Sequence, residues 1–221
     1  MPALVRYQTE LLLRSHRWLP PLLLYGAFLA VGLRPGEPVL DSLGWGATAV
    51  LPVAAWLVRV CVTNEPDAAR DCAAAAAGAW RAHLAAVLTA LLASLVLALA
   101  GSAVIAAISD PRSADRQVGV PLGAAAGAGL AAALTCALLG TAVGALCNRP
   151  LLRSTARSVP ATILAAFVVL FPAVSPARAA VTGLVTGSLD GTVTVPVLPL
   201  AAAAALAAGA TTLACALSAR R

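Results

Sequence analysis

Lysine is absent from this sequence: all 15 basic residues among its 221 residues are arginines. This absence excludes several kinds of chemistry. A P-loop needs a lysine at the nucleotide phosphates, a protein kinase needs one on its third strand, and pyridoxal or retinal enzymes need one for the Schiff base. We therefore expect that the chain does not hydrolyse ATP through a P-loop of its own, and that any use of ATP depends on a separate chain.

Charged residues are also scarce. They make up 11% of the chain, against roughly 25% in an ordinary soluble domain, and 61% of the residues are apolar. This composition excludes a soluble globular protein, which could not face water, and a disordered one, which needs low hydrophobicity and high charge. Lipid cannot satisfy an open strand edge, so the sequence predicts an all-α, polytopic membrane protein with a single transmembrane domain over residues 1–221.

Long apolar runs recur along the chain. A hydrocarbon core of ~30 Å needs about 20 apolar residues in a helix, and six stretches meet or approach this length, the first and the fifth being short. The sequence therefore predicts six transmembrane helices, over residues 18–33, 43–62, 84–108, 118–146, 159–174 and 197–217.

The arginines are distributed unevenly between the two sides of this six-span arrangement. One side carries Arg6, Arg14, Arg17, Arg59, Arg70, Arg81, Arg149, Arg153, Arg157, Arg220 and Arg221, and the other only Arg34, Arg112, Arg116 and Arg178. Because basic loops stay inside, we expect a multi-pass protein of the plasma membrane with both termini in the cytoplasm. The net charge of +6 then reflects membrane topology and does not indicate a nucleic-acid partner.

Residues that could carry catalysis are few. No carboxylate lies in the middle of a predicted span, where proton relays place them, and the two histidines, His16 and His83, are expected on the surface at the cytoplasmic interface. The five cysteines contain no CxxC pair, and none is expected outside the cell. The sequence thus predicts no catalytic, cofactor-binding or metal-binding residues, and we expect that the chain is not an enzyme.

Residues 1–17 precede the first predicted span. Leu4, Tyr7, Leu11 and, less regularly, Leu12 form an apolar stripe at helical spacing, and Gln8, three arginines and a glutamate provide a polar face. This pattern is typical of an interfacial helix lying on the cytoplasmic leaflet. The alternatives are an extension of the first transmembrane helix or a frayed tail. A cleaved signal peptide is disfavoured because no small-residue cleavage site follows the apolar run.

Residues 63–82 are the most polar part of the chain. Asn64 can cap a helix that has acidic residues in its first turn and ends near Gly78. We expect a short cytoplasmic helix that docks a soluble partner; the alternative is a longer third transmembrane helix that protrudes into the cytosol. The candidate docking residues are Asn64, Glu65, Asp67, Arg70 and Asp71.

Residues 175–196 form an unusually apolar external segment in which only Arg178 and Asp190 are charged. Prolines and glycines interrupt it too often for a spanning helix. Irregular backbone at membrane depth is tolerated where protein or a water-filled cavity surrounds it. The sequence predicts a re-entrant helical hairpin that enters from outside, with a loosely packed surface loop as the alternative.

Glycines recur in the fourth predicted span, at Gly119, Gly123 and Gly127 and again at Gly140 and Gly144. Small residues at four-residue spacing let helices approach closely in lipid. This spacing predicts a helix-packing face.

Taken together, the interfacial helix, the six spans, the polar cytoplasmic helix and the external re-entrant element resemble the permease subunit of type-2 ATP-binding-cassette (ABC) exporters. The resemblance covers essentially the whole chain and concerns topology. It implies a dimeric translocation domain, with a second permease chain that is either identical (a homodimer) or different (a heterodimer), powered by a separate cytoplasmic ABC ATPase that contacts residues 64–77. A non-transporting scaffold or assembly subunit is the alternative function, and a passive channel a third. The sequence does not indicate the substrate.

The topology can be tested directly. Reporter domains fused to either terminus should be active only when the reporter requires the cytoplasm, because the arginine asymmetry retains both ends there. A C-terminal fusion that reports from outside the cell contradicts the six-span arrangement.

Overall fold

The computed structural model describes residues 1–149, 151, 154–172 and 174–219. Over these residues the chain forms nine α-helices. Their bounds are α1 (Pro2–Ser15), α2 (Leu19–Gly32), α3 (Val39–Asn64), α4 (Asp67–Ala77), α5 (Ala79–Ile108), α6 (Leu122–Cys147), α7 (Thr155–Leu170), α8 (Pro176–Asp190) and α9 (Val197–Ala219).

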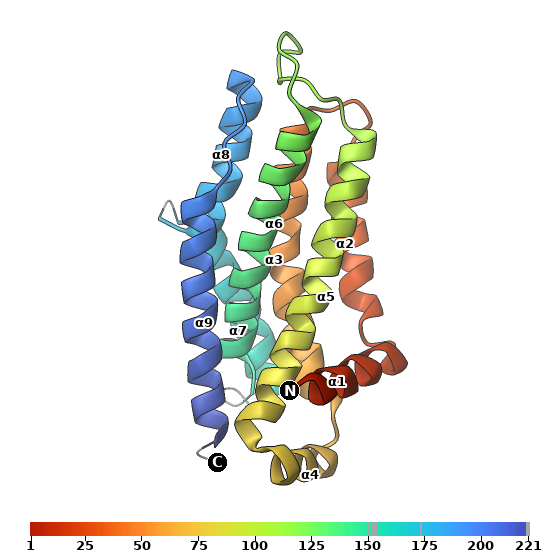
Figure 1. Cartoon of the computed structure of the whole chain (residues 1–221), viewed down its shortest axis with the longest axis vertical. Helices are drawn as coiled ribbons and strands as arrows, with labels where there is room; N and C mark the ends of the chain where they lie inside the picture. The colour runs from red at the N-terminus through yellow and green to blue at the C-terminus, as the bar shows by residue number, and fades with distance from the viewer. Residues whose placement is uncertain (150, 152–153, 173, 220–221) are drawn as a thin grey trace.

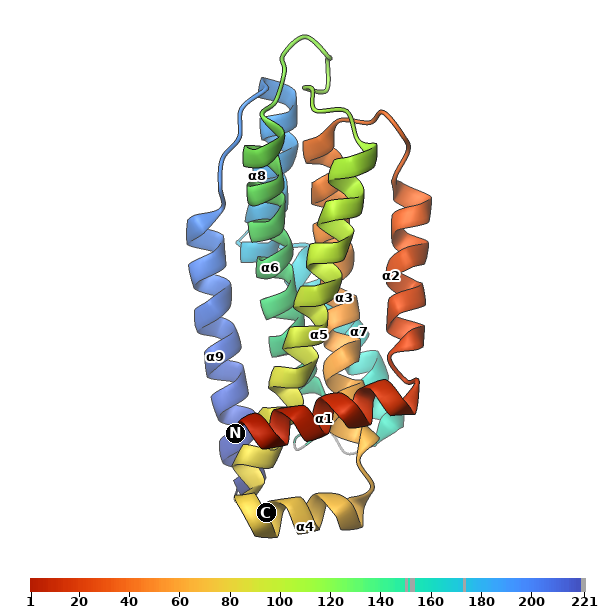
Figure 2. The ribbon, with the colours of Figure 1, turned by 45° about the vertical axis from the view of Figure 1, so that its right-hand side comes forward.

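The long helices run side by side in one bundle (Figure 1). Helix α1 lies across one end of this bundle, and α4 and the end of α9 lie at the same end (Figure 2). We call this the α4 end, and the opposite end, where α8 finishes, the α8 end. Arg153, Arg220 and Arg221, which contributed to the orientation argument, lie outside the described residues.

Among the described residues, four helices are long and apolar enough to cross a membrane: α3, α5, α6 and α9. These helices indicate a membrane protein and correspond to four of the six predicted spans. The other two are shorter, since α2 has 14 residues and α7 has 16, or about 21 and 24 Å at 1.5 Å per residue. Prolines at the start of α2 and just beyond α7 accompany this shortening, and the six-span topology is not confirmed.

Helices α3 and α6 form the centre of the bundle, and their most apolar stretches are 72% and 67% buried. Glycines of α6 allow the contact: a Cβ at Gly140 would meet the Leu51 carbonyl and lie 2.8 Å from the Ala54 Cβ, and one at Gly144 would lie 2.6 Å from the Val58 Cβ. The predicted packing face is therefore confirmed at these two glycines.

The same prediction is wrong at the other three glycines. A Cβ at Gly119, Gly123 or Gly127 would have nothing within 4 Å. These residues lie before α6 or on its exposed side, whereas α3 covers the side that carries Gly140.

Helix α1 is confirmed as a separate helix that lies across the bundle. His16, in the left-handed conformation at φ 55°, ends it, and α2 begins three residues later. The buried side agrees with the prediction at Leu12, which is buried, but differs from it at Gln8, which is also buried, and at Tyr7, which is 41% exposed. Gln8 is buried because its amide has a carboxylate partner, described below.

Helix α4 confirms the short helix expected within residues 63–82. It follows Pro66, has Asp67 in its first turn and ends at Gly78, whose φ of +92° favours glycine. No residue of α4 is buried. Asn64 does not cap it, since Asn64 is the last residue of α3 and no side chain caps the start of α4.

The segment 175–196 contains one helix, so the predicted helical hairpin is not confirmed. Helix α8 is followed by residues 192–196 without regular secondary structure, and this segment returns along α8 with the Thr192 carbonyl against Gly187. Helices α7 and α8 follow each other along the bundle axis, α7 nearer the α4 end (Figures 1 and 2). Ser175 begins α8 by accepting a hydrogen bond from the Ala177 amide.

The contact between α3 and α6 predicts that two similar substitutions in α6 change the free energy of unfolding by different amounts. Gly140→Val should lower the free energy of unfolding by at least about 2 kcal/mol, because the new side chain meets α3 backbone that cannot move aside. Gly127→Val is the matched control and should change it by less than about 0.5 kcal/mol. Denaturation in detergent micelles measures both, and equal effects contradict the packing described here.

Candidate functional site

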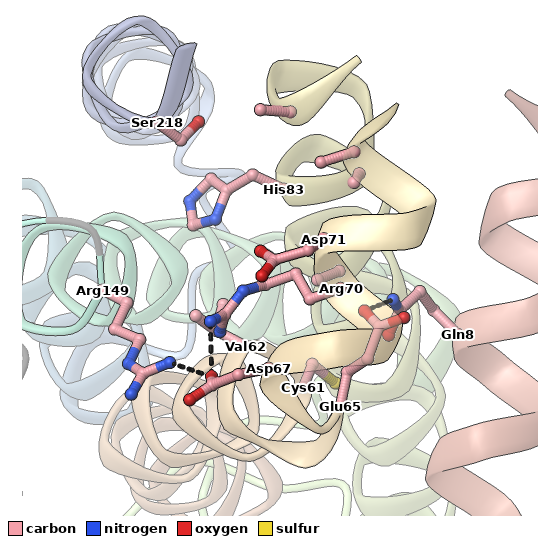
Figure 3. A pocket seen from close by; sticks show the side chains of 14 residues that line it. Gln8, Cys61, Val62, Glu65, Asp67, Arg70, Asp71, His83, Arg149 and Ser218 are labelled. Carbon is pink, nitrogen blue, oxygen red and sulfur yellow. Dashed lines mark hydrogen bonds and ion pairs between the residues drawn. The ribbon is translucent and has the colours of Figure 1, made fainter. Parts of the chain in front are cut away.

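A polar cavity of about 430 Å³ lies at the α4 end, between α4 and the ends of the long helices. Helices α1, α3, α4, α5 and α9 and the residues after α6 all contribute to its wall (Figure 3). Its polar side chains are Gln8, Glu65, Asp67, Arg70, Asp71, His83, Arg149 and Ser218. The cavity thus contains four of the five predicted docking residues.

Glu65 connects this region to α1. It is only 6% exposed and accepts hydrogen bonds from the Tyr7 hydroxyl at 3.0 Å and the Gln8 amide at 3.1 Å. Partial burial raises the pKa of Tyr7, and the hydrogen bond to Glu65 raises it further. Glu65 therefore points into the protein and holds α1 in place, so it does not offer its charge to a partner.

Asn64 has a similar internal role. Its side-chain amide donates to the Leu11 carbonyl at 3.2 Å and to the Ser15 hydroxyl at 3.1 Å. Both acceptors lie in the last turns of α1. Asn64 thus joins the end of α3 to the end of α1 and does not cap the start of α4.

Asp67 holds the first turn of α4 against the end of α6. Its carboxylate accepts from Arg70 at 2.5 Å and from Arg149 at 2.8 Å, and Figure 3 shows it between the two guanidinium groups. Arg149, and then Arg70, hold the pKa of Asp67 below its usual 3.8. The carboxylate is therefore charged, and both ion pairs persist, throughout the physiological pH range.

Asp71 is the exception among the predicted docking residues. It is exposed, lies one turn beyond Asp67, and takes part in none of the ion pairs between described residues. Its charge is thus available to a partner, together with the exposed side of α4 formed by Ala68, Cys72, Ala75 and Ala76.

His83 is not the surface histidine that the sequence predicted. It lies in the first turns of α5 and lines the cavity, and its Nε2 atom is buried without a hydrogen-bond partner among the described residues. The sequence could not indicate this position, because the cavity exists only when α4 folds back over the ends of α3 and α5.

Arg178 and Asp190 lie away from the cavity, on α8. Arg178 is exposed and donates to the Phe171 carbonyl at the end of α7, and Asp190 is the exposed last residue of α8. The structure therefore separates the predicted site residues into two regions.

Sequence reasoning missed the contacts made by Arg59 and Arg149. Arg59 donates to the Asn148 side chain at 3.2 Å and to the Ser158 hydroxyl, and Arg149 reaches Asp67. These contacts join residues 82 to 99 positions apart, so no local pattern could have indicated them.

Three of the charged groups in the cavity, Asp67, Arg70 and Arg149, are paired with each other. The part of the chain that the structure describes has no group of three His, Cys, Asp or Glu side chains placed to hold a metal ion. Comparison of the chain with protein-family models, with curated proteins and with solved structures gives no match. The function is therefore inferred from the geometry of the molecule.

The role of Glu65 predicts a large loss on truncation. Glu65→Ala should reduce the free energy of unfolding by about 2 to 4 kcal/mol, because two hydrogen bonds to a buried carboxylate are lost. Glu10→Ala removes an exposed partner of Arg6 and should cost less than about 0.5 kcal/mol. Chemical denaturation in detergent compares the two, and equal stabilities contradict an anchoring role for Glu65.

Proposed function

We propose that the chain is the membrane permease subunit of an ATP-driven exporter, powered by a separate cytoplasmic ABC ATPase, with two permease chains forming the translocation path. The observation that carries the proposal is α4. This helix stands off the bundle, has no buried residue and yet is fixed at its first turn by Asp67 and Arg149.

The energetics of α4 support a partner. An isolated helix of 11 residues is marginal in water, since most helical stability comes from packing an apolar face. The exposed alanines and Cys72 gain little unless a groove receives them. Asp71, a charged residue beside that surface, contributes more to the choice of partner than to the binding affinity.

The separate ATPase is supported by the sequence. The chain has no lysine, so it lacks the phosphate-binding residue of a P-loop. ATP-driven transport therefore requires a P-loop ATPase outside this sequence, which the proposal places on a separate chain.

Six membrane crossings remain part of the proposal. In this arrangement α2 and α7, although short, cross together with α3, α5, α6 and α9. The described ends of the chain lie at the α4 end (Figure 1), which fits an even number of crossings. The arginines of α1, α4 and the start of α5 also lie at that end, so we assign it to the cytoplasmic face of the plasma membrane.

Asp71 allows docking to be tested without disturbing the ion pairs of Asp67. Asp71→Arg should lower the affinity of the permease for its ATPase by roughly fivefold, because one charge in the contact is reversed. Coupled ATP hydrolysis and export by the purified complex in proteoliposomes should fall with it. The measurements are ATPase titration and export rate.

Glu10→Arg is the control, since it reverses another exposed carboxylate at the α4 end and should leave both quantities unchanged. If Asp71→Arg binds its ATPase and exports at the normal rate, α4 is not the docking element. A chain that yields no ATPase complex at all favours the scaffold function instead.

A further inference from the structure

Helix α3 is open on a single side along the part that leads to the α4 end. Between residues 47 and 63 every residue of this helix is buried except Thr48, Pro52, Trp56, Arg59 and Thr63. These residues follow each other at intervals of three or four, so they form one stripe along the helix. We call them the α3 open stripe.

The stripe changes from polar to apolar along the helix. Thr63 and Arg59 lie nearest the α4 end. Trp56, which is 37% exposed, and Pro52 lie about 4 and 10 Å farther from that end at 1.5 Å per residue. The stripe therefore suits an amphipathic ligand whose charged end lies toward the α4 end.

Arg59 is a half-buried cation with unused hydrogen-bond donors. A single terminal nitrogen, Nη1, makes both of its side-chain hydrogen bonds, to the Asn148 side chain and the Ser158 hydroxyl. Among described residues, its Nε and Nη2 atoms have no acceptor and its guanidinium group is in no ion pair. Since all five N–H groups of a guanidinium are donors, the remaining ones are available to a ligand.

A second arginine lies at the same end of the stripe. Arg17, in the turn between α1 and α2 at the α4 end (Figure 2), is exposed and donates to the Thr63 carbonyl at 3.4 Å. The Thr63 hydroxyl in turn donates to the Arg59 carbonyl at 2.8 Å. Arg17 also belongs to none of the ion pairs between described residues. Two positive charges thus lie near the end of α3.

The carboxylates of the neighbouring elements do not compensate these charges. Glu65 accepts its hydrogen bonds from α1, and Asp67 is paired with Arg70 and Arg149. Helix α7, which packs against α3, contributes none, because the sequence has no Asp or Glu from residue 116 to residue 189. Compensation is therefore left to solvent ions or to a ligand.

The level of Arg59 matches that of lipid phosphates. Asn64, five residues farther along α3, is bonded to α1, and an amphipathic helix lies at the boundary between headgroups and acyl chains. Five residues correspond to about 7.5 Å, which a long arginine side chain spans. Asn148, just beyond α6, receives the guanidinium group at that boundary. Trp56 and Pro52 then lie beside the acyl chains.

We propose that the α3 open stripe binds an anionic phospholipid, with its phosphate held by Arg59 and Arg17 and one acyl chain lying along Trp56 and Pro52. Arginine forms strong charge-assisted hydrogen bonds with phosphate, and basic sites between membrane helices bind anionic headgroups. A zwitterionic lipid fits less well, because no carboxylate is available to its ammonium group. The inference goes beyond the proposed function and requires only that the α4 end lie at a membrane interface.

The test is native mass spectrometry of the purified chain in detergent micelles, titrated with phosphatidylglycerol or with phosphatidylcholine. The native chain should bind its first phosphatidylglycerol about tenfold more tightly than its first phosphatidylcholine. Arg59→Gln should lower the affinity for phosphatidylglycerol roughly tenfold and Arg17→Gln roughly fivefold, because each removes a positive charge from the phosphate. Both substitutions should also reduce the preference between the two lipids.

Arg81→Gln is the matched control, since Arg81 is another exposed arginine at the α4 end but lies over the Trp80 ring of α5. It should leave both affinities unchanged. An equal loss in Arg81→Gln indicates attraction to the overall charge and overturns the site, as does equal binding of the two lipids by the native chain. Displacement of phosphatidylglycerol by excess inorganic phosphate identifies a site for a soluble anion and overturns the lipid assignment.

Arg17→Gln keeps the proposal falsifiable if Arg59→Gln does not fold, because it leaves the bonds of Arg59 to Asn148 and Ser158 in place. Unchanged lipid affinity in a folded Arg17→Gln chain then overturns the proposal. The measurement uses the chain without an ATPase, so its failure is distinguishable from failure of docking at Asp71.

Discussion

The close contact between α3 and α6 is the interaction on which the rest of the structure depends. Because Gly140 and Gly144 have no side chains, the two backbones approach within contact distance along the middle of the bundle. Helix α3 then holds other elements at both of its ends. Asn64 and the adjacent Glu65 hold α1, and near the start of α3 Asp41 accepts a hydrogen bond from Ser188 of α8. One buried helix, α3, thus positions both α1 beside the cavity at the α4 end and α8 at the opposite end.

The features that the sequence predicted well are those set by local chemistry. Apolar runs of 20 residues or more became α3, α5, α6 and α9, and α4 ends at Gly78 as expected. The two short helices, α2 and α7, show where run length alone is insufficient, because hydropathy does not tell where a helix starts and ends beside prolines.

The side-chain partners could not be predicted in the same way. Asn64 and Glu65 stand in the most polar loop of the chain, so local reasoning assigned them to a cap and a docking surface. Their partners in α1 lie 49 to 58 residues away. The glycines of α6 show the same limit. Gly127 and Gly140 have similar apolar neighbours all around the helix, so the sequence did not reveal which side of α6 faces α3.

The packing of α3 against α6 also limits how the cavity at the α4 end and helix α8 can influence each other. The contact at Gly140 has no room for sliding, because a shift of one turn places larger side chains of α6 against the carbonyls of α3. These two helices therefore move as one body. Asp67 joins α4 to Arg149 just beyond α6, so force applied to α4 by a partner reaches this body at one point. Under the proposed function, opening of a translocation path then requires movement of the peripheral helices around α3 and α6, such as α5 and α9, whose most apolar stretches are only 22% and 28% buried.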